Sequence, residues 1–114
     1  MTYGDIEERV RVLMNDATEP YRFVAKEVYR CVLDAVWHLR SVRPETRYVD
    51  GVLAAYEPML DKIDADTEIP LPMRWGEALA RYAAYDLYLA NNPDTEDASL
   101  AGSHLQRAEA LMQI

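Results

Sequence analysis

Residues 23–42 read FVAKEVYRCVLDAVWHLRSV, and this stretch decides the fold class. Arg43-Pro44 ends it, because proline disfavours helical dihedral angles in the residue before it. The stretch predicts a long amphipathic helix in a mainly α-helical protein. At steps of about 100° per residue, its apolar side chains share one broad face: Val24, Ala25, Val28, Cys31, Val32, Ala35, Val36, Leu39 and Val42.

Three further segments repeat this helical spacing on either side of the first. We expect helices over about residues 4–15, over about 73–90 and from Thr95 to the C-terminus, with a break at residues 91–94. The predicted fold is therefore a small bundle of about four helices, forming one domain over residues 1–114.

The insert between the second and third helices, about residues 44–72, is the least ordinary part of the chain. Asp50-Gly51 stands between two apolar pairs, which is typical of a β-hairpin turn. The later part, residues 56–69, has room for another short strand or two. A structureless segment of this length is uncommon inside a compact domain, so we expect the insert to be functional or to have structure of its own.

The insert is both acidic and apolar. Seven of the twenty acidic residues lie in it, against the two bases Arg47 and Lys62. A solvated linker does not need large apolar side chains, so those of the insert are our first candidates for contacts with other subunits: Tyr48, Val52, Leu53, Tyr56, Met59 and Ile63.

Two aromatic and apolar pairs lie off the main apolar faces of the helices. Leu33 and Trp37 are one turn apart in the second helix, and Tyr85 and Tyr88 lie on the otherwise polar side of the third. Exposed aromatic residues near arginines are typical interface anchors. Either these four residues contact a partner, or the insert folds back and covers them.

Composition excludes several classes of protein. The chain of 114 residues has a net charge of −8, whereas nucleic-acid and anionic lipid surfaces need clustered Lys and Arg. The single cysteine excludes an internal disulfide framework and a cysteine-based zinc cluster. Charges begin at once at the N-terminus, and no apolar run reaches the roughly 20 residues that span a bilayer. These features predict a small acidic intracellular domain.

Few residues could carry catalysis or bind a metal. Asp34 and His38 lie one helical turn apart, but they are only two ligands and are expected to make a surface hydrogen bond or ion pair. His104 is expected to face solvent. Cys31 lies on an apolar face with no histidine adjoining it in helical register, so we expect a small buried hydrophobe rather than a nucleophile.

The acids at positions 61, 64 and 66 resemble part of a calcium loop. The central glycine and the closing glutamate of such a loop are missing at their required offsets, so a solvated acidic loop is expected. The four glycines are scattered, and no phosphate-binding loop is formed from them. The sequence therefore predicts no enzyme, no cofactor and no metal.

Asp86 is the ionisable residue with the most unusual position. It falls near the centre of the apolar side of the third helix, among Trp75, Leu79 and Tyr82. Buried charges must be paired or neutralised. We therefore expect Asp86 to be a buried structural charge held by an ion pair or a tyrosine hydrogen bond.

The order of these pieces resembles the head–tail adaptor, or connector, proteins of tailed bacteriophages. The resemblance covers nearly the whole chain and rests on DATEPYRF at 16–23, LRSVRP at 39–44, IPLP at 69–72 and MRWGEALARYAAYDL at 73–87, with a last helix after Asp94. These stretches are patterns of residue type rather than catalytic signatures.

The resemblance implies a structural protein of the virion neck, made in the cytoplasm of the host bacterium. Family members assemble as rings, typically of twelve copies, beneath the portal protein, where they extend the DNA channel and offer a platform to tail proteins. DNA would pass through without specific binding, and the insert at 44–72 would face the channel or a neighbouring subunit. Family members commonly extend past the last helix with a portal-docking tail, whereas this sequence ends at Gln113-Ile114. Either the last helix or the insert would then dock on the portal.

A second interpretation is a small acidic helical module that binds or regulates a partner, for example by mimicking the charge of DNA. The acidity suits both interpretations, because like charge suppresses phosphate binding, and it also suits ordinary solubility. Competition of a basic protein away from DNA would favour the second interpretation.

Overall fold

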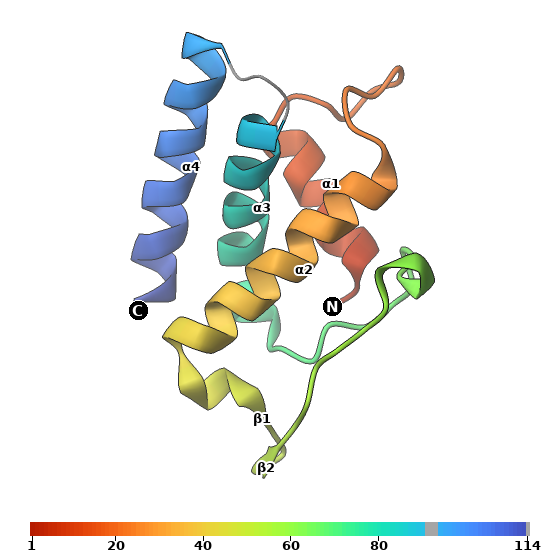
Figure 1. Ribbon diagram of the computed structural model, residues 1–114, viewed down its shortest axis with the longest axis vertical. Helices are drawn as coiled ribbons and strands as arrows, with labels where there is room; N and C mark the ends of the chain where they lie inside the picture. Colours follow the sequence, from red (N-terminus) through yellow and green to blue (C-terminus); the bar gives the residue numbers. More distant parts are fainter. Residues whose placement is uncertain (91–93, 114) are drawn as a thin grey trace.

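The computed structural model describes residues 1–90 and 94–113, and four helices account for most of them (Figure 1). They are α1 (Tyr3–Leu13), α2 (Ala25–Val42), α3 (Gly76–Ala90) and α4 (Thr95–Met112). The mainly helical prediction is confirmed, and the bounds differ from the expected ones by less than a turn. The first predicted turn of the third helix is a 3₁₀ helix, η3 (Met73–Trp75). Of the predicted break, residues 91–93 lie outside the described residues, as does residue 114.

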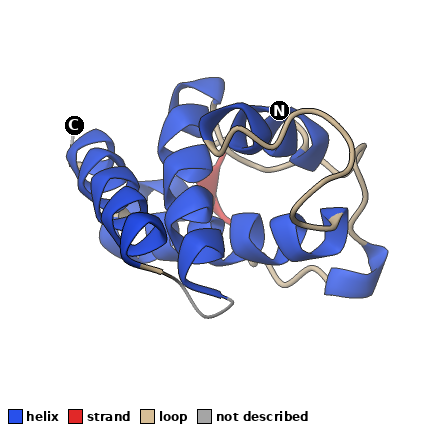
Figure 2. Cartoon of the chain, turned by 90° about the horizontal axis from the view of Figure 1, so that it is seen from above, coloured by secondary structure: helices blue, strands red, loops and turns tan. Residues whose placement is uncertain are grey.

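Helix α3 is the centre of the bundle. It packs against each of the other three helices, and Figure 2 shows it between α4 on one side and the pair α1 and α2 on the other. Its small side chains explain how three helices can approach it: Ala80, Ala83 and Ala84 are all fully buried. A helix surface built from alanine lets neighbouring backbones come close without leaving voids.

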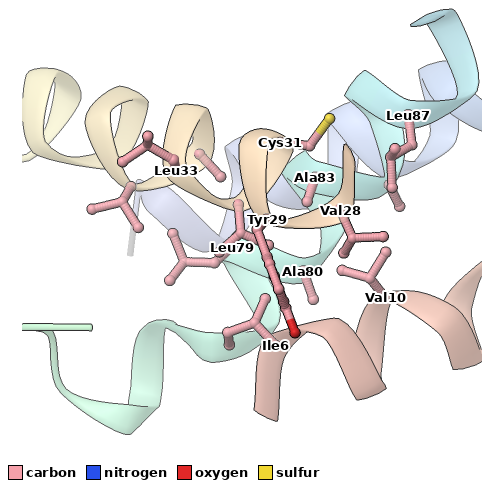
Figure 3. Packing of buried hydrophobic residues seen from close by; sticks show 14 of the residues in the cluster. Ile6, Val10, Val28, Tyr29, Cys31, Leu33, Leu79, Ala80, Ala83 and Leu87 are labelled. Carbon is pink, nitrogen blue, oxygen red and sulfur yellow. The ribbon is translucent and has the colours of Figure 1, made fainter. Parts of the chain in front are cut away.

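The core is formed by the apolar faces that the sequence predicts. Val28, Val32 and Leu39 of α2 meet Leu79 and Leu87 of α3 in one cluster, which α1 closes from the other side (Figure 3). Cys31 is buried in this cluster, as expected for a small hydrophobe. Burial of large aliphatic side chains stabilises such a core by about 1.5–3 kcal/mol each.

A buried carboxylate organises the loop between α1 and α2. Asp16 accepts hydrogen bonds from the Arg11 guanidinium at 2.9 Å and from the backbone N–H groups of Arg22 and Phe23. Arg11 also donates to the Phe23 carbonyl at 3.1 Å. Because both charges are paired and hydrogen-bonded, the loop can be held tightly against the bundle.

The insert contains the predicted hairpin, but not a second pair of strands. Its elements are η1 (Pro44–Arg47), β1 (Tyr48–Val49), β2 (Val52–Leu53) and η2 (Leu60–Lys62). Residues 56–69, where another strand or two was expected, contain η2 and, as their β structure, an isolated bridge between Glu68 and Thr2. Its backbone is hydrogen-bonded to the start of the chain, where the Ile69 N–H donates to the Met1 carbonyl at 2.9 Å.

The junction between the insert and the N-terminus leaves no room for a side chain. The Tyr3 N–H donates to the Thr67 carbonyl and the Gly4 N–H to the Ala65 carbonyl, each at 2.9 Å. A Cβ atom at position 4 would lie 2.8 Å from the Ala65 oxygen. Glycine is required here because the two backbones approach so closely.

Candidate interaction surface

The hairpin at residues 48–53 has a tight two-residue turn. Tyr48 pairs with Leu53 and Val49 with Val52, in antiparallel register. Asp50 and Gly51 both have positive φ, 50° and 79°, as a type I′ turn requires. Asp-Gly meets that requirement with little strain, so the local sequence determines this turn.

All four strand side chains of the hairpin are exposed, although all are apolar or aromatic. Val52 and Leu53 have 67% and 64% of their surface accessible, and Tyr48 and Val49 are exposed as well. Figure 1 shows the hairpin projecting from the end of the bundle where α2 finishes. A large part of each of these side chains remains accessible, which is unusual for strands of this composition.

The base of the hairpin is held by side chains that bind its backbone. The Arg40 guanidinium donates to the Ala54 carbonyl, and the Arg47 Nε donates to the Arg40 carbonyl at 2.9 Å. The Trp37 indole N–H donates to the Tyr56 carbonyl at 3.0 Å. These hydrogen bonds hold both ends of the hairpin against the last turns of α2.

Tyr56 connects this base to α1. Its hydroxyl makes a short hydrogen bond with the Tyr3 hydroxyl, and its ring lies under the Arg40 guanidinium. Burial raises the pKa of Tyr56 above its usual value, and burial together with the Tyr56 bond does the same for the pKa of Tyr3. Both phenols are thus neutral donors and acceptors, and Tyr56 is half-buried rather than a free contact residue.

Ile63 of the insert is buried, contrary to the expectation that it contacts another subunit. It was a candidate subunit contact, but only 1% of its surface is accessible, because the second half of the insert packs into the core. Lys26 holds that half in place by donating to the carbonyls of Leu60, Asp61 and Ile63. Met59, beside this anchor, remains exposed as a contact residue would be.

The helix candidates Leu33 and Tyr88 are also buried, each with 6% of its surface accessible. Leu33 is part of the core cluster, to which the insert also contributes Tyr56 and Ile63. Tyr88 is covered by α4, where its ring stacks on His104 at 5.8 Å. Contrary to the expectation, Leu33 and Tyr88 are therefore not accessible to another molecule in the folded monomer.

Trp37 and Tyr85 remain at the surface. Trp37 is 47% accessible, and the half-buried Tyr85 packs edge-on against Tyr82 at a centroid distance of 5.4 Å. Together with Tyr48, Val52, Leu53 and Met59, they are the predicted contact residues that another molecule could reach. We call the exposed set Tyr48, Val49, Val52, Leu53 and Met59 the insert surface. Of these five residues, Val49 was not among the expected contacts.

Asp86 is half-buried rather than buried, and its partners differ from those expected. It lies close to the Cys31 thiol and to the Asp34 carboxyl group, both on α2. Burial and then the Asp86 charge raise the pKa of Asp34, and burial raises the pKa of the Cys31 thiol. Asp86 therefore lies beside a carboxyl group and a thiol of α2, and neither the ion pair nor the tyrosine hydrogen bond that the sequence suggested is found among the described residues.

Both histidine rings pack against neighbouring side chains of the bundle. Asp34 pairs with Arg30 at 3.7 Å, while the His38 ring stacks on Tyr82 at 4.4 Å. His104, expected to face solvent, is buried at the α3–α4 contact, and its Nδ1 accepts from the Arg81 guanidinium at 3.2 Å. Burial and then Arg81 lower the pKa of His104, so it is neutral at pH 7. A helical wheel shows the side on which His104 lies, but not that α3 covers it.

The acids of the insert form a local turn. The Asp64 carboxylate accepts from the Asp66 N–H at 2.9 Å and from the Thr67 hydroxyl at 3.2 Å. Within residues 1–90 and 94–113, no three His, Cys, Asp or Glu residues are grouped closely enough to hold a metal ion. No helix in this part of the chain has the length and apolar character needed to cross a membrane.

Comparison with known proteins finds no protein family, no curated protein and no solved structure that matches this chain. Any functional conclusion therefore depends on the chain's own residues and on the resemblance of its sequence pattern.

Proposed function

We propose that this chain is a head–tail adaptor of a tailed bacteriophage. It would assemble as a ring between the portal protein and the tail or neck proteins. The family that the sequence resembles typically forms rings of twelve copies. One observation carries the proposal: a hairpin with four exposed apolar side chains projects from a bundle that anchors it firmly.

The exposed hairpin supports a contact with another protein. Large apolar side chains grouped on a fixed element mark protein interaction sites, because their burial provides the driving force for association. Val52 and Leu53 contribute little to the core of their own subunit, since most of their surface is accessible. In a ring, the same heterologous contact repeats until the rotation closes.

The charge of the insert supports a position near a DNA channel. Asp50, Glu57 and Asp61 are exposed on it, and the whole chain has a net charge of −8. Like charge suppresses binding to phosphates, so DNA would slide past such a surface without adhering. This arrangement suits a conduit rather than a DNA-binding protein.

The test is electron microscopy of the chain mixed with a phage portal protein, or of virions that contain it. A ring at the neck would support the proposal. The double variant Val52→Ser, Leu53→Ser should abolish ring formation and head–tail joining. The matched control is Val12→Ser, Val24→Ser, which changes two equally exposed residues far from the hairpin. Normal joining in the hairpin variant, or a chain absent from the neck, would contradict the proposal.

A second candidate is an acidic module that binds a basic partner. It is favoured by the net charge of −8 and by the carboxylates of Asp34, Asp86 and Glu109, which all lie near Tyr82. This function predicts that the purified chain releases a basic DNA-binding protein from DNA. The variant Asp34→Asn, Asp86→Asn should lose that effect, whereas the hairpin variant should keep it.

A further inference from the structure

Helix α4 lies at the edge of the bundle, and its main contact is with α3 (Figure 2). His104 lies halfway along α4 and is buried against α3, with its ring plane 7° from that of Tyr88. Histidine is the side chain that normally gains or loses its charge between about pH 5 and 8. A buried histidine at a helix contact can therefore make that contact sensitive to pH.

The hydrogen bond at His104 requires a neutral imidazole. Arginine can only donate, so the Nδ1 atom accepts from the Arg81 guanidinium at 3.2 Å and has no hydrogen of its own. A protonated imidazole carries a hydrogen on both nitrogens and cannot accept this bond. Protonation would therefore break the bond and leave two cations side by side.

The charges beyond this bond also favour the neutral imidazole. The Arg81 Nε donates to the Glu77 carboxylate at 3.0 Å, and Arg9 of α1 donates to the same carboxylate at 2.8 and 3.0 Å. Two cations share one anion, so the network of Arg9, Glu77, Arg81 and His104 is positive even before His104 gains a proton. Burial and then the Arg81 charge lower the pKa of His104, against an opposite effect of Glu77.

The other charged groups near this contact do not offset a proton on His104. Arg22 of the loop before α2 lies 5.7 Å from the centre of the Tyr88 ring and binds Asp97 of α4 at 2.7 Å. This ion pair is neutral overall, so it adds little to the field at the imidazole. On α4 itself, Arg107 is about one turn away from His104, and it is a further cation.

We propose that the contact between α3 and α4 is a pH-sensitive switch, in which protonation of His104 breaks its bond to Arg81 and loosens α4. The proposal does not depend on the adaptor function. An imidazole released from the contact titrates near its usual pKa of 6.5, above its pKa in the closed contact. Helix α4 is therefore fully held above about pH 6.5 and loosens as the pH falls toward the lower pKa.

The switch has consequences on both sides of α3. Opening of α4 would uncover the ring of Tyr88 together with Ala101 and Ala108, which are buried in the closed bundle. Newly exposed apolar surface of this kind can bind another protein. Because Arg81 is linked through Glu77 to Arg9, the charge of His104 also acts on the position of α1.

The first test is amide hydrogen exchange of the full chain, read residue by residue between about pH 7.5 and pH 5 and corrected for the intrinsic effect of pH. Amides around His104 should exchange faster than those of α2, because α4 opens separately from the rest of the bundle. The opening constant of α4 should rise several-fold as the pH falls, up to a ceiling of about thirtyfold set by an open imidazole with a pKa of 6.5. His104→Gln should abolish the rise, and the matched control His38→Gln should keep it.

The second test reads the proton directly, by NMR titration of the His104 ring. Arg81→Gln should raise the pKa of His104, because a neutral amide does not repel the imidazolium. Glu77→Gln should lower it, because the carboxylate is lost while the charges of Arg81 and Arg9 remain. The matched control Arg74→Gln, which removes an exposed charge of η3 outside the network, should leave it unchanged. A variant that merely loosened the fold would raise the pKa toward 6.5 in both cases, so opposite shifts are specific to the network.

Three results would overturn the proposal. One is a pKa of His104 at or above 6.5 in the folded chain. Another is equal protection of α2 and α4 at every pH, which would mean that α4 opens only when the whole chain unfolds. The third is a pH dependence of α4 exchange that survives in His104→Gln.

Discussion

The bundle core and the hairpin use the same side chains in opposite environments. Leu79 in α3 is fully buried, whereas Leu53 in β2 is mostly exposed. The core holds its shape through the packing of side chains, while the hairpin holds its shape through a tight turn and hydrogen bonds at its base. The comparison teaches that apolar residues of the hairpin are not needed by the fold and are free for contact with another protein.

The largest expected effect comes from truncating one leucine in each region. Leu79→Ala should lower the free energy of unfolding by about 2–5 kcal/mol, because it leaves a cavity in the core. Leu53→Ala should lower it by less than about 0.5 kcal/mol, as for other exposed positions. Urea denaturation monitored by circular dichroism measures both. A loss at Leu53 as large as that at Leu79 would show that the hairpin is part of the stabilising core.

A pair of glycines tests how firmly the insert is bound to the N-terminus. Gly4→Ala should destabilise the chain by about 1–3 kcal/mol, since its Cβ would collide with the Ala65 backbone. Gly102→Ala, in open space on α4, should stabilise it by about 0.5–1 kcal/mol through helix propensity. Thermal melts of the two variants should therefore move in opposite directions. Melting temperatures that move together would mean that the junction can relax.

The base of the hairpin can be loosened without disturbing the bundle. Arg40→Met removes the donor to the Ala54 carbonyl and should cost about 0.5–1.5 kcal/mol. Because the loss is local, amide exchange at Ala54, whose N–H donates to the Arg47 carbonyl, should accelerate more than exchange in α3. Hydrogen exchange read residue by residue distinguishes the two regions. Uniform acceleration would indicate that hairpin and bundle open together.

The smallest effect is a pH dependence that belongs to the bundle. The pKa of His104 is lower in the folded chain than its usual value of 6.5, so the unfolded chain binds the proton more tightly. Its contribution to stability should be complete above about pH 6.5 and should be lost as the pH falls toward the folded pKa. His104→Gln should flatten this part of the stability curve in thermal melts at a series of pH values. If the curve of the variant keeps the same slope, another group is responsible.

The helices and the hairpin turn could be predicted because each depends on local sequence. Apolar residues at helical spacing fixed the faces of α2 and α3, and Asp50-Gly51 suits a turn with two positive φ angles. Contacts between distant segments could not be predicted in the same way. Ile63, Tyr88 and His104 are buried by elements far along the chain, and no periodicity indicates which element will cover a given side chain.

The candidate site was predicted in part for the same reason. Hairpin residues such as Val52 keep most of their surface accessible in the described chain, and the sequence showed only that they were apolar. Asp86 fell on the apolar side of its helix, but Cys31 and Asp34 on α2 border it and leave it half-buried. The network from Arg9 to His104 joins residues from three helices and has no signature in any one of them.

The anchoring of the hairpin has a consequence for how its specificity can change. Trp37 and Arg40 hold main-chain oxygens at positions 56 and 54, and every amino acid supplies such an oxygen. Substitutions at Tyr48, Val52 or Leu53 can therefore alter what the tip recognises while the frame that presents it stays intact. The chain can acquire a new binding partner one residue at a time, and the same tip is a suitable position for grafting a chosen recognition sequence.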